Sequence, residues 1–344
     1  MPLPLETCVF QTPRYFHHHH CHHHLIHQCL QPLLLRRHYH VQTGFSKHAT
    51  YPHPIRNWPE AIARDVSSLP ATLGRQINDQ PDLDLLYFEP YIPSYMAKDV
   101  FEFLRAELPF YRVEYDINRG GIQAHIKTPR YTTVFGVDDT SYFDTDGAVV
   151  DKPPAAGSSS STTKPANAKP PRYAPRPIPQ CLDLLRTSTE AATGCTFNFC
   201  LVNYYASGAD SISFHSDDER FLGPEPAIAS FSLGARRDFL MKHKKPATAA
   251  AAAERVDAKK PLKLPLGSGD MILMRGRTQS NWLHSIPKRT GKNQDDGGRI
   301  NITFRRAMVK AGTDNYYNYN VGTGPVYRWD AQSRQMMLWT SKED

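Results

Sequence analysis

Short segments with strand-like patterns dominate the sequence after residue 196, and this feature limits the possible fold most strongly. Each segment is apolar throughout or alternates apolar with polar residues, and Gly, Pro or Asp residues bound it. The segments are 197–205, 227–233, 238–243, 270–274 and 299–306. Many short strands preceded by helices are typical of two packed β-sheets with flanking helices. We therefore expect an α+β fold that is mainly β.

The helices are predicted upstream of these strands. A strand-like run at 85–88 is followed by a helix that begins near Ser94, a plausible N-cap. Apolar residues then recur at helical spacing, namely Met96, Val100, Phe103, Leu104 and Leu108. A second helix is predicted over 180–192, and Gly194 ends it.

Composition divides the chain into a tail and one domain. Twelve of the sixteen histidines precede residue 54, so residues 1–80 form a His-rich basic tail. This tail is either a metal-binding tract or low-complexity sequence, and it also has some features of a mitochondrial transit peptide. We expect order from about Leu83, one domain over 81–320, and an extension over 321–344. Low apolar content predicts surface insertions at about 147–179 and 244–263.

Charge and cysteine content decide little about function. The net charge of +7 is concentrated in the N-terminal tail and in 244–263, segments that either bind phosphates or are simply solvated. The six cysteines show no CxxC pair, which favours reduced thiols. No apolar run reaches the 18 or more residues of a membrane span. We expect no membrane association, and we expect a monomer in the nucleus, with mitochondrion or cytoplasm as alternative locations.

Outside the tail, four histidines remain as candidate metal ligands: His125, His215, His243 and His284. His215 and Asp217 are two residues apart in an extended segment, so their side chains point to the same side. With a second histidine such as His284 they would form a facial triad, which leaves open positions on non-haem Fe(II). A His-x-Asp pair alone is a weak signal.

Polar residues on two predicted strands strengthen this hypothesis. In 299–306, Arg299, Asn301, Thr303 and Arg305 alternate with Ile300, Ile302 and Phe304. A polar face turned to solvent would make this an ordinary half-buried strand. A polar face turned inward would require anionic partners for both arginines, and a small dicarboxylate would supply them. Asn203 and Tyr205 share a face of another strand and could bind the same ligand.

In this order, the motifs resemble the AlkB family of Fe(II)/2-oxoglutarate dioxygenases, particularly its eukaryotic DNA-repair branch. The resemblance is strong over 173–307 and weak over 83–145, and it rests on Asn203-x-Tyr205, His215-Ser216-Asp217-Asp218-Glu219-Arg220, the segment 228–239 and the strand 299–305. It implies a double-stranded β-helix (jelly-roll) core. It also implies that Fe(II), 2-oxoglutarate and O2 are used.

The resemblance also implies roles for individual residues. It assigns iron to His215, Asp217 and His284. It assigns the distal carboxylate of 2-oxoglutarate to Arg299 and Tyr205, and the keto-acid end to Arg305, Asn203 and Asn301. For the substrate it points to Glu219 as the residue that reads a flipped base and to Asp218 as a support that pairs with Arg130. The segment 129–136 resembles a substrate lid, and Tyr142 or Phe143 is a candidate for stacking on the base.

The function implied is oxidative demethylation of 1-methyladenine- or 3-methylcytosine-type lesions, with release of formaldehyde, succinate and CO2. DNA is favoured over RNA as partner. No apolar residue that wedges into a duplex is identified, although Gly121-Ile122-Gln123 falls near that position, so single-stranded substrates stay open. The alternatives are an RNA-base demethylase, a hydroxylase of a protein or small molecule, and a nucleic-acid binding module with an inactive iron site.

Overall fold

Two antiparallel sheets dominate the computed structural model, which describes residues 44–136, 141–143, 149–151, 176–244, 261–289, 298–308 and 324–340. The helices are α1 (Glu60–Val66), α2 (Ser94–Glu107), α3 (Gln180–Thr193), α5 (Thr278–Asn281) and the 3-10 helix η1 (Arg220–Leu222). The strands are β1 (Phe45–Ser46), β2 (Ile55–Arg56), β3 (Arg75–Ile77), β4 (Leu85–Phe88), β5 (Phe110–Tyr111), β6 (Glu114–Arg119), β7 (Ile122–Lys127), β8 (Tyr131–Gly136), β9 (Ser141–Phe143), β10 (Val149–Asp151), β11 (Phe199–Tyr205), β12 (Ile212–His215), β13 (Ile228–Gly234), β14 (Arg237–His243), β15 (Leu262–Leu266), β16 (Met271–Met274), β17 (Trp282–Ile286), β18 (Arg299–Arg305), β19 (Val326–Asp330) and β20 (Gln335–Leu338).

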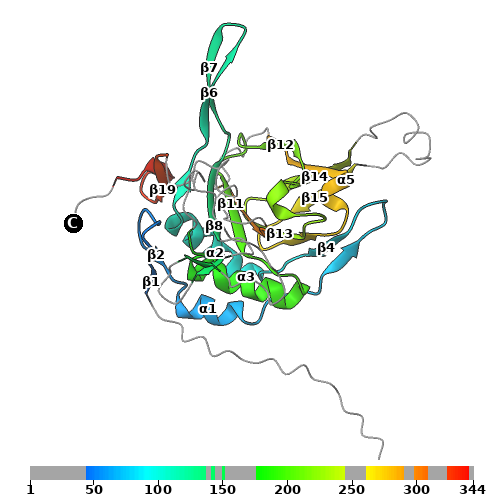
Figure 1. Cartoon of the computed structure of the whole chain (residues 1–344). Coiled ribbons are helices and arrows are strands. Elements are labelled where there is room, and N and C mark those ends of the chain that lie inside the picture. The colour runs from blue at the N-terminus through cyan, green and yellow to red at the C-terminus, as the bar shows by residue number, and fades with distance from the viewer. Residues whose placement is uncertain are drawn as a thin grey trace, which may run out of the picture. The chain divides into compact units, whose positions relative to one another are not determined.

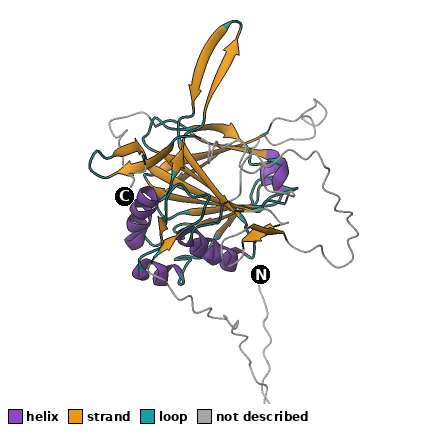
Figure 2. Ribbon diagram, turned by 60° about the vertical axis from the view of Figure 1, so that its left-hand side comes forward, coloured by secondary structure: helices purple, strands orange, loops and turns teal. Residues whose placement is uncertain are grey.

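The larger sheet has ten strands in the order β20-β19-β5-β8-β11-β18-β13-β16-β4-β3, and the smaller has four in the order β12-β17-β14-β15. Helices α1, α2 and α3 gather beside the large sheet, whereas α5 lies with the small sheet (Figures 1 and 2). All five strands predicted after residue 196 are present, each with bounds shifted by no more than two residues. This is the mainly β, jelly-roll architecture that the sequence predicts.

Alternation along the central strand β11 explains how the layers are held together. Cys200, Val202 and Tyr204 pack in the apolar cluster that includes residues of α2 and α3. Phe199, Leu201 and Tyr205 belong to a second cluster that includes residues of β14, β15 and β17 in the small sheet. A strand covered on both faces must be apolar on both. Polar residues on such a strand, such as Asn203, therefore mark a site between the sheets.

The two predicted helices form, with one correction at a cap. α2 begins at Ser94, but Pro93 occupies the N-cap position and no side chain caps the helix. A proline there loses nothing, because its missing N–H would have no partner inside the helix. α3 ends at Gly194, which adopts the left-handed conformation (φ 69°) as expected for a glycine C-cap.

Both ends of the domain differ from the prediction. Residues 44–80, assigned to the tail, contribute Ile55, Trp58 and Val66 to the core beside α2 and α3. The C-terminal extension supplies β19 and β20, which lengthen the large sheet. The predicted insertions lie mostly outside the described residues, but Leu262 and Lys263 already belong to β15. Isolated apolar residues among prolines and histidines gave no periodic signal for the N-terminal part.

Strands β6 and β7 form a separate hairpin that pairs with no other described strand and projects from the rest of the fold (Figures 1 and 2). Gly120 and Gly121, both with positive φ, form its turn, and the neighbouring Ile122 is 73% exposed. Among the described residues, no helix has the length and apolar character needed to cross a membrane.

Candidate metal and co-substrate site

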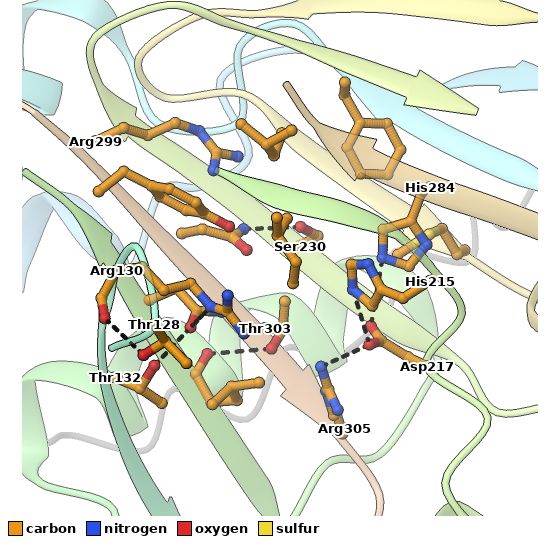
Figure 3. Close-up of a pocket in the computed structure, with 18 of the residues that line it drawn as sticks. Thr128, Arg130, Thr132, His215, Asp217, Ser230, His284, Arg299, Thr303 and Arg305 are labelled. Carbon is orange, nitrogen blue, oxygen red and sulfur yellow. Dashed lines mark hydrogen bonds and ion pairs between the residues drawn. The ribbon is translucent and has the colours of Figure 1, made fainter. Parts of the chain in front are cut away.

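Three potential metal ligands meet at the edge of the small sheet. His215 ends β12 and lies directly opposite His284 on β17, and Asp217 follows two residues after His215. One oxygen of Asp217 lies 3.7 Å from His215 Nε2 and the other lies 3.8 Å from His284 Nε2. One ligand atom from each residue falls within 4.8 Å of the other two. These side chains converge at one end of the cavity (Figure 3), as required for a facial triad.

The electrostatics of this cluster suit metal binding. Burial lowers the pKa of His284 to about 4, so its imidazole is neutral at neutral pH. Burial alone would raise the pKa of Asp217, but Arg305 and the two histidines hold it below its ordinary value. A neutral imidazole and an ionised carboxylate are the forms in which histidine and aspartate bind a divalent cation.

A second cluster, around Arg299, lies between the sheets. Gly298 precedes Arg299 with φ +80°, and a Cβ there would come within 2.7 Å of the Tyr205 carbonyl oxygen, so the strands approach this closely only with glycine. Arg299 is 1% exposed, its Nε donates to Ser232 Oγ at 2.8 Å, and its guanidinium lies 5.4 Å from the Tyr205 ring centre. No described residue accepts a hydrogen bond from Arg299 Nη1. A buried cation with an unused donor fits an anionic ligand.

Two asparagines on neighbouring strands, Asn203 on β11 and Asn301 on β18, face each other across the ladder. Asn203 Oδ1 accepts hydrogen bonds from Thr132 Oγ1 (2.9 Å) and Arg130 Nε (3.3 Å), which directs its amide hydrogens elsewhere. Asn301 Nδ2 donates to Ser230 Oγ (2.9 Å) and the Phe231 carbonyl (2.7 Å). Asn203 therefore offers donors to a carboxylate, whereas Asn301 would first have to turn its amide.

Arg305 joins the metal cluster to the predicted substrate residues. Its Nη2 lies 3.0 Å from Asp217 and its Nη1 lies 3.1 Å from Glu219 Oε1. The predicted pair of Asp218 with Arg130 is wrong. Asp218 instead binds Lys244 Nζ at 2.9 Å, because Asp218 lies outside the cavity while Arg130 lies inside it and contacts Asn203.

One cavity of about 280 Å³ contains most of these residues. Its walls include the three metal ligands, both buried arginines, Arg130, Glu219 and the polar faces of β11 and β18. The lid segment predicted at 129–136 corresponds to β8 and the residues before it, at the foot of the β6–β7 hairpin. Tyr142 lies on β9, together with Phe143, but the side chains of both lie outside the described part of the structure.

Comparison with known proteins places this arrangement in a family. The profile of the 2OG-Fe(II) oxygenase superfamily matches residues 84–305. The chain belongs to this superfamily. Within it, the chain is an AlkB-family member of the eukaryotic branch, and hence an Fe(II)- and 2-oxoglutarate-dependent dioxygenase.

The relatives differ in how much of their length aligns. The chain is 31% identical over 237 residues to the Arabidopsis thaliana protein named DNA oxidative demethylase ALKBH2, which covers 65% of this chain and 67% of that protein. It is 38% identical over 135 residues to human ALKBH2, covering 39% of this chain and 49% of that protein. It is 40% identical over 124 residues to human alpha-ketoglutarate-dependent dioxygenase alkB homolog 3, and this alignment covers 36% of this chain and 41% of that protein. The aligned part of the chain thus spans less than half of the length of these two human relatives.

For an AlkB-family dioxygenase, the residues present fit both cofactors. The His215, Asp217 and His284 donors suit Fe(II), since two imidazoles and a carboxylate form its usual triad in such oxygenases. The unused donor of the buried Arg299 suits a carboxylate of 2-oxoglutarate. Burial raises the pKa of Tyr205, which keeps its phenol protonated and able to donate to the same carboxylate.

Several residues that support the site were not predicted from the sequence. Ser230 and Ser232 on β13 hold Asn301 and Arg299, and Gln279 on α5 binds the backbone of Asp217. Two serines at alternate positions of an otherwise apolar strand were a usable signal for the first pair. No pattern marks Gln279, since it lies in a four-residue helix 62 residues from its partner.

Proposed function

We propose that this dioxygenase removes alkyl groups from nucleic-acid bases, with 1-methyladenine and 3-methylcytosine in DNA as its substrates. The proposal rests on one observation above all: Glu219 lines the same cavity as the metal triad, and Arg305 holds it beside Asp217. It is supported by the similarity to relatives in Arabidopsis and human that are named DNA oxidative demethylases.

The chemistry of the lesions fits the charges of the cavity. Methylation at N1 of adenine or N3 of cytosine gives a cationic base that retains an exocyclic amino group. The Glu219 carboxylate, paired with Arg305 at 3.1 Å, offers hydrogen-bond acceptors to a base and no donor. An ionised carboxylate favours a cationic base with an amino donor over a neutral base that presents a carbonyl there.

The protein's own residues then orient the reaction. When bound, Fe(II), O2 and 2-oxoglutarate supply the oxidising power that hydroxylates the N-methyl group, and the hydroxymethyl base releases formaldehyde. Arg299 and Tyr205 would hold one carboxylate of the co-substrate, and Asn203 would donate to its other end. Glu219 would fix the base so that its methyl group faces the triad. Arg299, Tyr205 and Asn203 are buried, which limits the access of water to these contacts.

A base within a duplex must leave the stack to reach this cavity. The β6–β7 hairpin rises from residues at the cavity wall, since Val113 and Thr128 flank it and line the cavity. Its exposed Ile122 is the candidate for contact with bases beside the lesion. We propose DNA as the preferred polymer, with single-stranded DNA the simplest substrate because no base pair with a partner strand has to be broken.

Formaldehyde release tests the proposal. Methylated and unmethylated oligonucleotides, as single- and double-stranded DNA and RNA, are incubated with Fe(II), 2-oxoglutarate and the full-length protein. We expect formaldehyde and succinate in equal amounts from methylated DNA. Succinate without formaldehyde from any oligonucleotide would indicate a protein or small-molecule substrate, and release from RNA alone would indicate an RNA-base demethylase. The absence of both succinate and formaldehyde would indicate a binding module with an inactive iron site.

A further inference from the structure

The loop that carries Asp217 is anchored from behind the cavity. The backbone N–H of Asp217 donates to Gln279 Oε1 at 2.9 Å, and both residues are buried, at 4% and 1% exposure. Gln279 lies on α5, which continues directly into β17, the strand that carries His284. One side-chain hydrogen bond thus ties the loop of one metal ligand to the element that supplies another.

A lysine adds a second connection between the same two segments. Lys244 Nζ lies 2.9 Å from Asp218 Oδ2 and donates to the Gln279 carbonyl oxygen at 3.1 Å. The Lys244 backbone N–H donates to the Asn281 carbonyl at the end of α5, at 2.7 Å. Residues 217 and 218 are therefore held to α5 twice, once through a buried amide and once through an ammonium group.

Neither Gln279 nor Lys244 lines the cavity. Any effect of these side chains on the metal must pass through the position of Asp217. That position matters because a metal site needs its ligands placed within about 0.5 Å, and a loop residue is harder to place than a strand residue. His215 and His284 are fixed by strand pairing, while Asp217 follows the end of β12.

We propose that Gln279 and Lys244 are positioning residues that set the metal affinity of the site by fixing the Asp217–Asp218 loop against α5. Gln279 fixes the backbone of Asp217, and Lys244 holds the next residue through its carboxylate. The inference concerns the metal site alone and does not depend on which substrate is oxidised. A result against demethylation of nucleic acid would leave it standing.

Metal binding by the full-length protein tests the inference. The protein is stripped with a chelator, and Mn(II), which binds such sites without oxygen chemistry, is titrated by calorimetry. We expect Gln279→Met to weaken Mn(II) binding by about 10- to 100-fold, the usual effect of losing a partner behind a ligand. We expect Lys244→Gln to weaken it by roughly two- to fivefold, because this pair is partly exposed, and Lys244→Arg to restore the affinity to within about twofold.

Two matched control variants distinguish an effect on the position of the Asp217–Asp218 loop from a general loss of stability. Ser280→Ala alters the exposed neighbour of Gln279, and Lys242→Gln removes an exposed lysine on the strand that leads to Lys244. Both should bind Mn(II) as the parent does. The melting temperature of each metal-free variant is measured alongside, since a purely structural role would lower it without changing the affinity.

Unchanged Mn(II) affinity in both Gln279→Met and Lys244→Gln would overturn the proposal, whatever happens to the melting temperature. Equal losses of Mn(II) affinity in Lys244→Gln and Lys244→Arg would exclude a role for the positive charge at position 244. If Gln279→Met does not fold, the Lys244 pair still decides, because that ion pair is partly exposed and its loss is tolerated more easily than that of a buried amide partner.

Discussion

Replacing Arg299 with methionine should have opposite effects on stability and on co-substrate binding. Burial lowers the pKa of Arg299 from its ordinary value to about 10. That difference corresponds to roughly 3 kcal/mol by which burial disfavours the charged side chain when no anion is bound. The substitution loses the bond to Ser232 and the contact with the Tyr205 ring, together about 1 to 2 kcal/mol. We expect a net gain of about 1 to 2 kcal/mol in the free energy of unfolding without ligand.

The affinity of Arg299→Met for 2-oxoglutarate should fall. Removing one partner of a buried ion pair costs about 3 to 5 kcal/mol, which is roughly a 150- to 5,000-fold loss of affinity for 2-oxoglutarate. Fluorescence-monitored unfolding with Mn(II), in the absence of oxygen and over a range of 2-oxoglutarate concentrations, measures both effects. The ligand-free melting temperature should rise by about 2 to 6 °C, and the stabilisation by 2-oxoglutarate should disappear.

Arg64→Met serves as the control, because this arginine is exposed on α1 and pairs only with Glu60 among the described residues. Its melting temperature and co-substrate affinity should match those of the parent. The reasoning fails if Arg299→Met binds 2-oxoglutarate within about tenfold of the parent, or if its ligand-free melting temperature falls by several degrees. Either result would mean that the Arg299 charge is compensated without a dicarboxylate.

Three further predictions concern the remaining parts of the site. His215→Ala and Asp217→Ala should each reduce turnover by more than about 100-fold and abolish high-affinity Mn(II) binding, with the circular dichroism spectrum unchanged; retained turnover would exclude the ligand assignment. Glu219→Gln should lower kcat/KM on methylated oligonucleotides by roughly 10- to 150-fold, since a hydrogen bond to a charged group is lost, while 2-oxoglutarate affinity stays within a few-fold; an equal loss in both would place Glu219 with the co-substrate instead. Ile122→Ala should lower activity on duplex relative to single-stranded DNA by about tenfold if this side chain occupies the gap left by a flipped base, and an unchanged ratio would exclude that contact.

The features that the sequence predicted are those with local periodicity. The alternation of 299–306 predicted a strand with one polar face, and the structure buries both faces of β18, with the polar one in the cavity. The pattern alone left the burial of that face open, because a half-buried strand with its polar face in solvent would show the same alternation. The helix over 180–192 and its glycine end were likewise readable from spacing and from the conformational preference of glycine.

The features that the sequence did not predict depend on contacts between distant segments. Trp58 and Ile55 pack beside α2 although their own neighbourhood reads as a tail, because single apolar residues become core only when another element covers them. Lys244 was placed at the start of a surface insertion, yet it binds Asp218 and α5. A lysine in a basic segment carries no sign of which carboxylate it will meet.

For Arg305, the sequence pattern predicted the location of the side chain but not all of its partners. Its place on the polar face of β18 was predictable, and so was its need for an anion, but the structure pairs it with Asp217 and Glu219 at the same time. The guanidinium thereby offsets negative charge around the metal and holds the Glu219 carboxylate in the cavity. A cationic base that approaches Glu219 would compete with Arg305 for that carboxylate and free one of its N–H groups for the keto-acid end of 2-oxoglutarate. Binding of base and co-substrate would then reinforce each other through one side chain. An arginine suits this position because its planar guanidinium directs separate nitrogens toward Asp217 and Glu219 in a fixed geometry.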